Sequence, residues 1–257
     1  MVHSQVQDKV IALTGASSGI ARSTAFYLAE RGAKLSLADV NAGPLREIAD
    51  EIKRTHDVEV IYFKVDVCNV DEVNAWIDGT VKAFGRLDGA ANLAGVIGKT
   101  LGVNSVAECD EDDWNLNISV NLTGVMHCLR AQLKAVSDGG SIVNAASIAG
   151  QIGRPFSASY AASKHGVLGL TRSAAKEVGS RGVRVSSIAP GPISTPMNSA
   201  AQKISAKNLG KESEASRIAL GRQGRPEEVA ALVAFLLGDE SKCITGVTYS
   251  IDGGWFC

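Results

Sequence analysis

The sequence lacks several features that define large classes of protein. No apolar run in its 257 residues approaches the roughly 20 residues needed to cross a bilayer, and residues 1–9 contain no apolar signal core. Its 26 basic and 27 acidic residues give a net charge of −1, which indicates no binding surface for nucleic acid or anionic lipid. We therefore expect a cytoplasmic protein that binds neither nucleic acid nor a membrane.

Cysteine and histidine are too scattered to indicate a metal site. The five cysteines form no CxxC pair and do not cluster with the four histidines, so the spacing predicts neither a zinc site nor a disulfide framework. We interpret the cysteines as buried free thiols and expect no metal. His165 receives no catalytic role, because it would point to a different side of the helix from Lys164.

Short apolar runs alternate with segments of helical spacing along the whole chain. The expected strands span 9–13, 34–38, 58–65, 87–93, 140–145, 183–189 and 247–251. The expected helices span 18–31, 42–54, 70–84, 112–137, 157–179 and 226–238. This order predicts an α/β fold with a doubly wound parallel sheet and helices on both faces. At this length we expect a single domain, residues 1–257.

A glycine-rich turn directly after the first predicted strand is the most informative motif. The run Thr14-Gly15-Ala16-Ser17-Ser18-Gly19-Ile20-Ala21 leads into a helical segment. Gly15 permits a tight turn, Gly19 lets the backbone approach a pyrophosphate, and the start of the helix offers unpaired N–H groups. A glycine turn alone can serve turn geometry only. Its place between strand and helix favours a Rossmann-type dinucleotide site that includes Gly15, Ser17, Ser18, Gly19 and Ile20.

An acidic residue at the end of the next predicted strand indicates which dinucleotide binds. Asp39 lies 20 positions after Gly19, about where an acidic residue reaches the hydroxyls of the adenosine ribose. Its carboxylate would repel the 2′-phosphate of NADP, and no basic residue stands at Ala16, Ser17 or Val40 to compensate. We therefore predict NAD as the cofactor, with NADP disfavoured.

Tyr160 and Lys164 open a predicted helix and, at a spacing of four, project from one face. A tyrosine has an ordinary pKa of about 10, which a nearby ammonium and the positive end of a helix both lower. Ser147 follows the predicted strand 140–145 and could hold a substrate oxygen beside Tyr160. Taken singly, the serine could be a helix cap and the lysine a solvated side chain. Together they favour acid–base chemistry on an alcohol or a carbonyl.

With these motifs the sequence resembles the short-chain dehydrogenase/reductase family along nearly its whole length. The matching motifs, in the family's order, are Thr14-Gly15 with Gly19, Asp66-Val67, Asn92-Leu93-Ala94-Gly95, Asn121, Ser147, Tyr160 with Lys164, Pro190-Gly191 and Asp252-Gly253-Gly254. One departure is Ala21, where the family usually has a third glycine. That position serves packing of the helix on the strand, which should tolerate one methyl group.

The resemblance implies a role for each matching residue of the catalytic set. Tyr160 would be the general acid and base, and Ser147 would polarise the substrate. Lys164 would bind the nicotinamide ribose and lower the pKa of Tyr160. Asn121 would hold a water in a proton relay, although an asparagine inside a helix can also simply form local hydrogen bonds. For Asn121 we expect a kink in the helix that exposes a carbonyl for that water.

The resemblance also implies contacts with the cofactor beyond the glycine turn. Asp66 and Val67 would flank the adenine, and Ile193 and Thr195 would bind the carboxamide. The other implied cofactor residues are Asn92, Ala94, Gly95, Tyr160, Lys164, Pro190 and Gly191.

These inferences predict an oxidoreductase that interconverts a secondary alcohol and a ketone with NAD, with oxidation as the favoured direction. The expected substrate pocket consists of Val96, Ile97, Ile148, Gln151, Ile152, Phe156 and Met197. It is mostly apolar and suits a hydrophobic alcohol such as a steroid, a terpenoid or another secondary metabolite. Residues 191–225 lack a clear period, and we interpret them as a substrate lid rather than a solvated loop. Two alternatives stay open, a non-redox tailoring enzyme and a dinucleotide-binding regulatory protein.

The long predicted helices also suggest an assembly. We interpret Ala131, Leu168, Leu170 and Ala174 as parts of an exposed pairing surface. The resemblance implies that these helices pair across a two-fold axis, with a second interface near the C-terminal strand at Tyr249, Trp255 and Phe256. We expect a homotetramer, with a dimer as the fallback.

Overall fold

A parallel sheet of seven strands forms the centre of the molecule in the computed structural model, which describes residues 5–205 and 218–256. The strands are β1 (Val10–Thr14), β2 (Lys34–Asp39), β3 (Val60–Lys64), β4 (Gly89–Asn92), β5 (Ser141–Ala145), β6 (Arg184–Pro190) and β7 (Thr248–Ile251). Their order is β3-β2-β1-β4-β5-β6-β7, and every neighbouring pair is parallel. The predicted doubly wound fold is confirmed.

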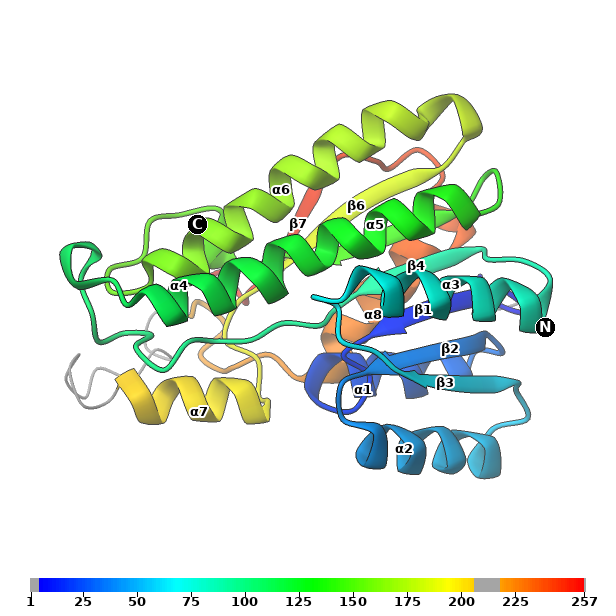
Figure 1. Ribbon diagram of the computed structural model, residues 1–257, viewed down its shortest axis with the longest axis horizontal. Coiled ribbons are helices and arrows are strands. Elements are labelled where there is room, and N and C mark those ends of the chain that lie inside the picture. The colour runs from blue at the N-terminus through cyan, green and yellow to red at the C-terminus, as the bar shows by residue number, and fades with distance from the viewer. Residues whose placement is uncertain (1–4, 206–217, 257) are drawn as a thin grey trace.

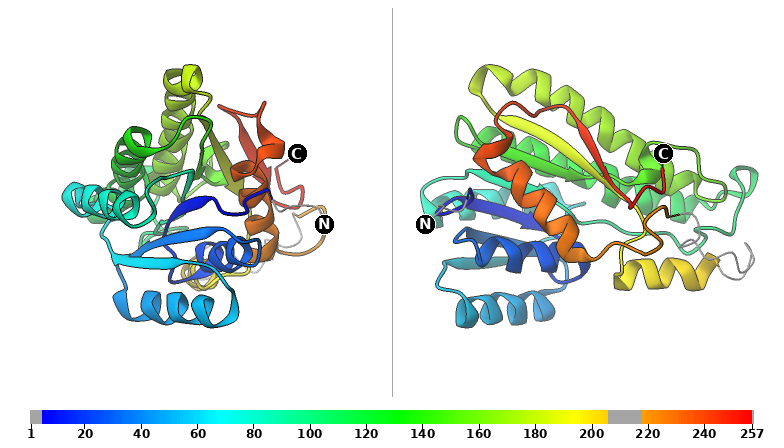
Figure 2. Two further views of the ribbon diagram at one scale, coloured as in Figure 1. Left: turned by 90° about the vertical axis from the view of Figure 1, so that its right-hand side faces the viewer. Right: turned by 180° about the vertical axis from the view of Figure 1, so that it is seen from behind.

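Helices cover both faces of the sheet (Figure 1, Figure 2). Buried apolar residues of α1 (Gly19–Ala29), α2 (Ala42–Thr55) and α8 (Pro226–Leu237) form one apolar cluster. Those of α3 (Val70–Phe84), α5 (Gly124–Ala135) and α6 (Ala158–Val178) belong to a second cluster on the other face. All residues of β1 are buried, which explains why its first four residues are apolar instead of alternating with polar residues.

The predicted helix 112–137 is divided into three consecutive elements. It consists of α4 (Glu111–Asn117), a π-helical turn η2 (Ile118–Thr123) and α5. The N–H of Gly124 donates to the carbonyl of Ser119, five residues earlier, as in a π-helix. Such turns occur frequently at functional sites. Asn121 thus lies in a π-helical turn, and the kink with an exposed carbonyl that we expected there stays a prediction.

The expected lid contains a helix that the sequence reasoning missed. Residues 191–225 were expected to lack regular structure, but α7 (Pro196–Ser205) occupies part of them. Pro196 suits the first turn of a helix, and the hydroxyl of Thr195 caps it by accepting from the N–H of Asn198 at 3.2 Å. Positions 206–217 of the expected lid lie outside the described residues.

Short 3-10 helices complete the described elements, at Val106–Glu108, Ile148–Gly150, Gly179–Arg181 and Asp239–Ser241. Across residues 5–205 and 218–256, each helix is too short or too polar to span a bilayer.

The cysteines differ from the expectation of buried thiols. Only Cys128 among the described cysteines is buried, and burial raises the pKa of its thiol to about 12. Cys68 is half-buried, and Cys109 and Cys243 are exposed. Cys257 lies outside the described residues.

Candidate active site

The order of the strands places a crevice at the carboxyl ends of β1 and β4. The chain leaves β1 towards β2 on one side and later returns to β4 on the other, and ligands of doubly wound sheets bind at such a switch point. Thr14 ends β1, and its hydroxyl accepts hydrogen bonds from the N–H groups of Leu93 and Ala94, both at 3.1 Å. The turns after the two strands are thereby held together.

The glycine turn after β1 has the geometry of a phosphate cradle. Gly15 has φ +74°, and a Cβ there would lie 2.9 Å from Cα of Ala94, so a larger residue would separate the two turns. Gly19 has φ +54° and begins α1. A Cβ on Gly19 would meet only Thr195, at 3.6 Å. The predicted carboxamide ligand Thr195 therefore lies beside the phosphate turn.

Asp39 is positioned beside this turn as predicted for a ribose ligand. Its side chain is 8% exposed, and one carboxylate oxygen accepts from the N–H of Ser17 at 3.0 Å. The other oxygen accepts from the backbone and side-chain N–H groups of Asn41, at 2.9 and 3.1 Å. A fixed carboxylate thus lies where the 2′-position of an adenosine ribose is expected.

Asp66 and Val67 lie where an adenine could be flanked, next to the end of β2. The N–H of Val65 donates to the carbonyl of Asp39, so this segment adjoins the end of β2. Asp66 is exposed, and its carboxylate accepts from the N–H of Cys68 at 2.9 Å. Val67 is nearly buried and packs against Gly124.

Asn92 has a different role from the one expected. Its side chain is 1% exposed, donates to Gln132 and Asn144 at 2.9 Å each, and accepts from Gln132 at 2.8 Å. The side chain therefore joins β4 to α5 and β5 inside the core and cannot line the cofactor. Ala94 and Gly95 are only partly buried and follow it towards the crevice.

The segment after β6 closes the other side of the crevice. A Cβ on Gly191 would lie 2.6 Å from Cβ of Asp252, so the Pro190-Gly191 and Asp252-Gly253-Gly254 motifs pack directly on each other. Ile193 is 3% exposed and belongs to the apolar core. A carboxamide could therefore contact the backbone of Ile193, and this predicted contact stays a prediction.

Ser147, Tyr160 and Lys164 converge at the end of β5. Ser147 precedes the 3-10 helix Ile148–Gly150, and its hydroxyl accepts from the N–H of Ala149 at 3.2 Å and is hydrogen-bonded to Tyr160. Tyr160 lies in the first turn of α6. Nζ of Lys164 lies 5.8 Å from the centre of the Tyr160 ring and donates to the carbonyl of Ala145 at 2.9 Å.

The sequence reasoning missed a glycine that makes this arrangement possible. A Cβ on Gly150 would lie 2.7 Å from the carbonyl oxygen of Lys164, so only glycine lets the 3-10 helix pack directly on α6. Its position three residues after Ser147 was the available signal.

Burial dominates the pKa values of the two titratable groups. Burial raises the pKa of Tyr160, and the hydrogen bond with Ser147 and the charge of Arg154 lower it by less. In the protein without cofactor, the charge that lowers the pKa of Tyr160 is that of Arg154, and the expected effect of Lys164 on this pKa stays a prediction. Burial also lowers the pKa of Lys164, to about 8.

Asn121 lies in the π-helical turn and is completely buried. Its amide oxygen accepts from the N–H of Val96 at 2.8 Å, and its amide nitrogen donates to the carbonyl of Val96 at 3.0 Å. The nitrogen also lies 3.3 Å from the hydroxyl of Ser163. Asn121 thus joins the segment after β4 to the helix that carries Tyr160 and Lys164.

The expected substrate residues divide by exposure. Phe156 and Met197 are 38% and 40% exposed, and Val96, Ile97, Gln151 and Ile152 are half-buried. The side-chain oxygen of Gln151 accepts from Ser250 at 2.9 Å. Ile148 is 3% exposed, so it packs inside the protein, and its assignment to the pocket was wrong.

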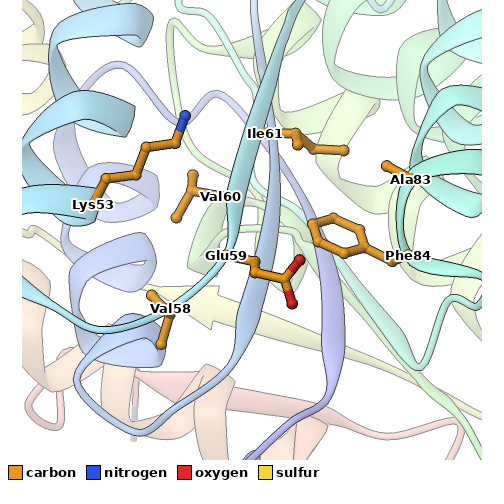
Figure 3. A pocket seen from close by; sticks show the side chains of 7 residues that line it. All are labelled: Lys53, Val58, Glu59, Val60, Ile61, Ala83 and Phe84. Carbon is orange, nitrogen blue, oxygen red and sulfur yellow. The ribbon is translucent and has the colours of Figure 1, made fainter.

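Two hollows of the surface lie around the sheet. One borders the phosphate turn at Ser17, Ser18 and Gly19 and continues along α1 to Phe26. The other, of about 400 Å³, lies at the amino end of β3, where Lys53, Glu59 and Phe84 line it (Figure 3). The second hollow is at the opposite end of the strand from the crevice and has no part in the site.

Comparison with known proteins identifies the family of this chain. Residues 15–256 match the family model described as enoyl-(acyl carrier protein) reductase. The chain is 52% identical over 251 residues to the short-chain dehydrogenase/reductase aba4 of Botryotinia fuckeliana (strain B05.10), with 97% of each chain covered. It is 36% identical over 260 residues to a cyclohexanol dehydrogenase of Acinetobacter sp. (strain SE19), covering 99% of this chain and 98% of the relative.

A solved structure of levodione reductase matches with a TM-score of 0.90 at 38% identity, over 96% of this chain and 97% of that one. The fold and the site define an oxidoreductase with a Rossmann-like fold. The chain belongs to the short-chain dehydrogenase/reductase family, whose members use nicotinamide dinucleotides and act on small molecules.

Proposed function

We propose that this protein is an NAD-dependent dehydrogenase that interconverts a secondary alcohol and a ketone on a hydrophobic substrate. The observation that carries the proposal is the convergence of Ser147, Tyr160 and Lys164 at the carboxyl end of β5. A phenol hydrogen-bonded to a serine and next to a buried lysine can exchange a proton with a substrate oxygen. That proton exchange is one half of the interconversion.

The other half requires a hydride carrier. A bound nicotinamide supplies the hydride acceptor or donor. The glycine turn and Thr195 would hold the dinucleotide, and the residues fit it, because Gly15 and Gly19 leave the start of α1 clear of side chains. The carboxylate of Asp39 favours NAD over NADP through its charge.

Tyr160 and Ser147 would have different roles in the proton exchange. The raised pKa of Tyr160 keeps its proton on the phenol near neutral pH in the absence of cofactor, so Tyr160 can donate it to a carbonyl oxygen. In the direction of oxidation, Tyr160 accepts the proton of the alcohol while Ser147 holds the same oxygen. The side-chain amide of Asn121 is occupied by Val96, Asn117 and Ser163, so a backbone carbonyl of its π-helical turn would bind the water of the proton relay.

The substrate would enter beside the half-buried residues Val96, Ile97 and Ile152 and the exposed Phe156 and Met197. These side chains are apolar and suit a steroid, a terpenoid or another secondary metabolite with a ring-borne hydroxyl. Two relatives are by name a cyclohexanol dehydrogenase and a levodione reductase, which supports an alcohol or a ketone as the substrate.

A panel of secondary alcohols from cyclohexanol to polycyclic compounds, each with NAD or NADP, tests this proposal. We expect a rise in absorbance at about 340 nm in proportion to the alcohol consumed, with NAD and not with NADP. Substrate change without a change in absorbance would favour a non-redox tailoring enzyme. Binding of NAD without turnover of any alcohol or ketone would favour a regulatory protein.

We also propose that the chain forms a homotetramer, with pairing through the expected helix 112–137 but through other side chains than those first considered. Ala131, Leu168 and Ala174 are 5–7% exposed, and Leu170 packs against the core. The exposed large apolar side chains of α4 are instead those of Trp114 and Leu116, 41% and 40% exposed. They support a contact between helices of two copies.

A further inference from the structure

The segment between β4 and α4 is fastened to the start of α4 by one carboxylate. Asp113 is 4% exposed and accepts hydrogen bonds from the N–H of Lys99 at 2.9 Å, from the N–H of Thr100 at 2.6 Å and from the hydroxyl of Thr100 at 2.5 Å. A Cβ on Gly98 would lie 2.6 Å from Cγ of Asp113. The absence of a side chain at Gly98 therefore allows the close contact.

Asp113 begins a column of polar side chains along one face of α4 and the π-helical turn. Asn117, four residues on, donates to the carbonyl of Asp113 at 2.9 Å and lies 3.2 Å from the hydroxyl of Ser159. Asn121, four residues further, donates to the amide oxygen of Asn117 at 3.1 Å and forms two hydrogen bonds with the backbone of Val96. The column reaches the turn of α6 that carries Tyr160.

The same segment is held at a third point. The N–H of Gly102 donates to the carbonyl of Phe156 at 2.6 Å. Phe156 has φ +57°, which is strained for a bulky residue and persists only where the surroundings hold it. Residues 96–102 are therefore fixed at Val96, at Lys99 and Thr100, and at Gly102. In Figure 1 this segment passes below α4 and α5 and turns back into α4.

Asp113 carries a negative charge that strengthens its hydrogen bonds to the segment. Burial raises the pKa of Asp113, but the hydrogen bonds from Thr100 and Lys99 and the charge of Lys99 outweigh it and hold the pKa below its ordinary value. The carboxylate therefore stays ionised near neutral pH, and its bonds to the segment are charge-assisted and strong. A bond of this strength fixes a loop that would otherwise fluctuate.

We propose that Asp113 is a positioning residue that fixes residues 96–100 as a rigid wall of the substrate site. The inference rests on the proposed function, since it assigns a task to Val96 and Ile97 towards the alcohol. The rigid wall holds the carbinol carbon in line with Tyr160, and a looser wall would bind the same substrate in more orientations. Small substrates depend most on the wall, because they make few other contacts.

The test compares Asp113→Asn with Asp112→Asn, a neutralised exposed neighbour in the same turn of α4. In Asp113→Asn, an amide NH₂ group replaces one carboxylate oxygen. This group cannot accept a hydrogen bond from the N–H groups of Lys99 and Thr100, so the contact with the segment would be broken. We expect faster hydrogen exchange in 96–104, a KM for cyclohexanol raised about tenfold, and a kcat reduced by less than about threefold. The Kd for NAD should be unchanged. The ratio of kcat/KM for cyclohexanol to that for a bicyclic secondary alcohol should fall.

Thr100→Val supplies a milder variant, because it removes one hydroxyl donor and nearly keeps the shape of the side chain. If Asp113→Asn does not fold, Thr100→Val should still raise the KM for cyclohexanol about threefold. The inference would be overturned if Asp113→Asn and Thr100→Val had the same hydrogen-exchange rates, KM and selectivity as Asp112→Asn. It would also be overturned if hydrogen exchange in 96–104 were faster while the KM for cyclohexanol stayed unchanged. If the wild type converts no alcohol with NAD, the proposed function is wrong. If the wild type is active but the variants behave like Asp112→Asn, only the role of Asp113 is wrong.

Discussion

Tyr160 is subject to opposing effects, since burial favours the phenol and the neighbouring hydrogen bond and charges favour the phenolate. Tyr160→Phe removes the exchangeable proton and leaves the ring in place. We expect NAD to bind as before and turnover to fall by at least about 10²-fold. Steady-state kinetics and a fluorescence titration with NAD measure the two quantities. Tyr62→Phe, a change on the exposed side of β3, is the control and should keep full activity.

The second prediction at the residue scale concerns the choice of cofactor. Asp39→Ala removes the repulsion of a 2′-phosphate, and Val40→Arg, at a position 54% exposed, adds a cation that can pair with it. The double variant should narrow or reverse the preference for NAD, as measured by the ratio of the two Kd values. Equal affinity of the unmodified protein for NAD and NADP would contradict the role of Asp39.

The depressed pKa of Lys164 gives a prediction about stability. In the folded protein the pKa of Lys164 is about 8, against an ordinary value of 10.5. Between about pH 8 and pH 10.5 the unfolded chain therefore binds more protons than the folded protein. Stability therefore rises with pH across this window. From about pH 7.5 to about pH 9.5, the free energy of unfolding of the wild type should gain about 1–2 kcal/mol relative to Lys164→Met.

Urea unfolding at the two pH values measures this difference. Lys176→Met, at an exposed position of the same helix, is the control and should follow the wild type. If the free energies of unfolding of the wild type and Lys164→Met changed equally with pH, burial of the Lys164 ammonium would not affect stability.

The sequence predicted the positions of those candidate site residues that belong to short segments of the chain. The glycine turn, Asp39 and the Tyr160-Lys164 pair belong to short segments whose geometry follows from strand, turn and helix order, and the structure brings them together as expected. The burial of Asn92, Ile148 and Ile193 depends on partners far away in the chain. No local pattern distinguishes such a side chain from one that faces the crevice.

At the scale of elements, the structure shows how irregular backbone serves the site. A helical period predicted one helix over 112–137, but hydrophobic spacing cannot show a π-helical turn, which inserts one residue into a continuous helix. In α7 the opposite error occurred. Its polar composition suggested a loop, whereas Pro196 and the cap from Thr195 start a helix.

Residues of α7 should be the most ligand-sensitive part of the described chain. No residue of this helix is buried, so its hydrogen bonds open at little cost. We expect its amides to exchange rapidly in the free protein and at least about tenfold more slowly with NAD and substrate bound. Amides of α2, which buries Leu45 and Ile52, serve as the internal control. Slow exchange in α7 that ligands do not change would refute its role as part of a lid.

At the scale of the whole molecule, the apolar side chains exposed on α4 should mediate assembly. Leu116→Glu places a charge in the proposed contact and should reduce the molar mass in light scattering from that of a tetramer towards smaller species. Tyr62→Glu, at an exposed position of the edge strand β3, should leave the mass unchanged. A wild type that is a fully active monomer at assay concentration would reject the proposed assembly.

The central claim, that the protein couples proton exchange at Tyr160 to hydride transfer, is tested most directly by isotope transfer. A secondary alcohol deuterated at the carbinol carbon would be incubated with NAD and the protein, and the cofactor analysed by mass spectrometry. We predict reduced cofactor that carries one deuterium per ketone formed, and almost none with Tyr160→Phe. An alcohol that is converted without transfer of deuterium to the cofactor would contradict the account.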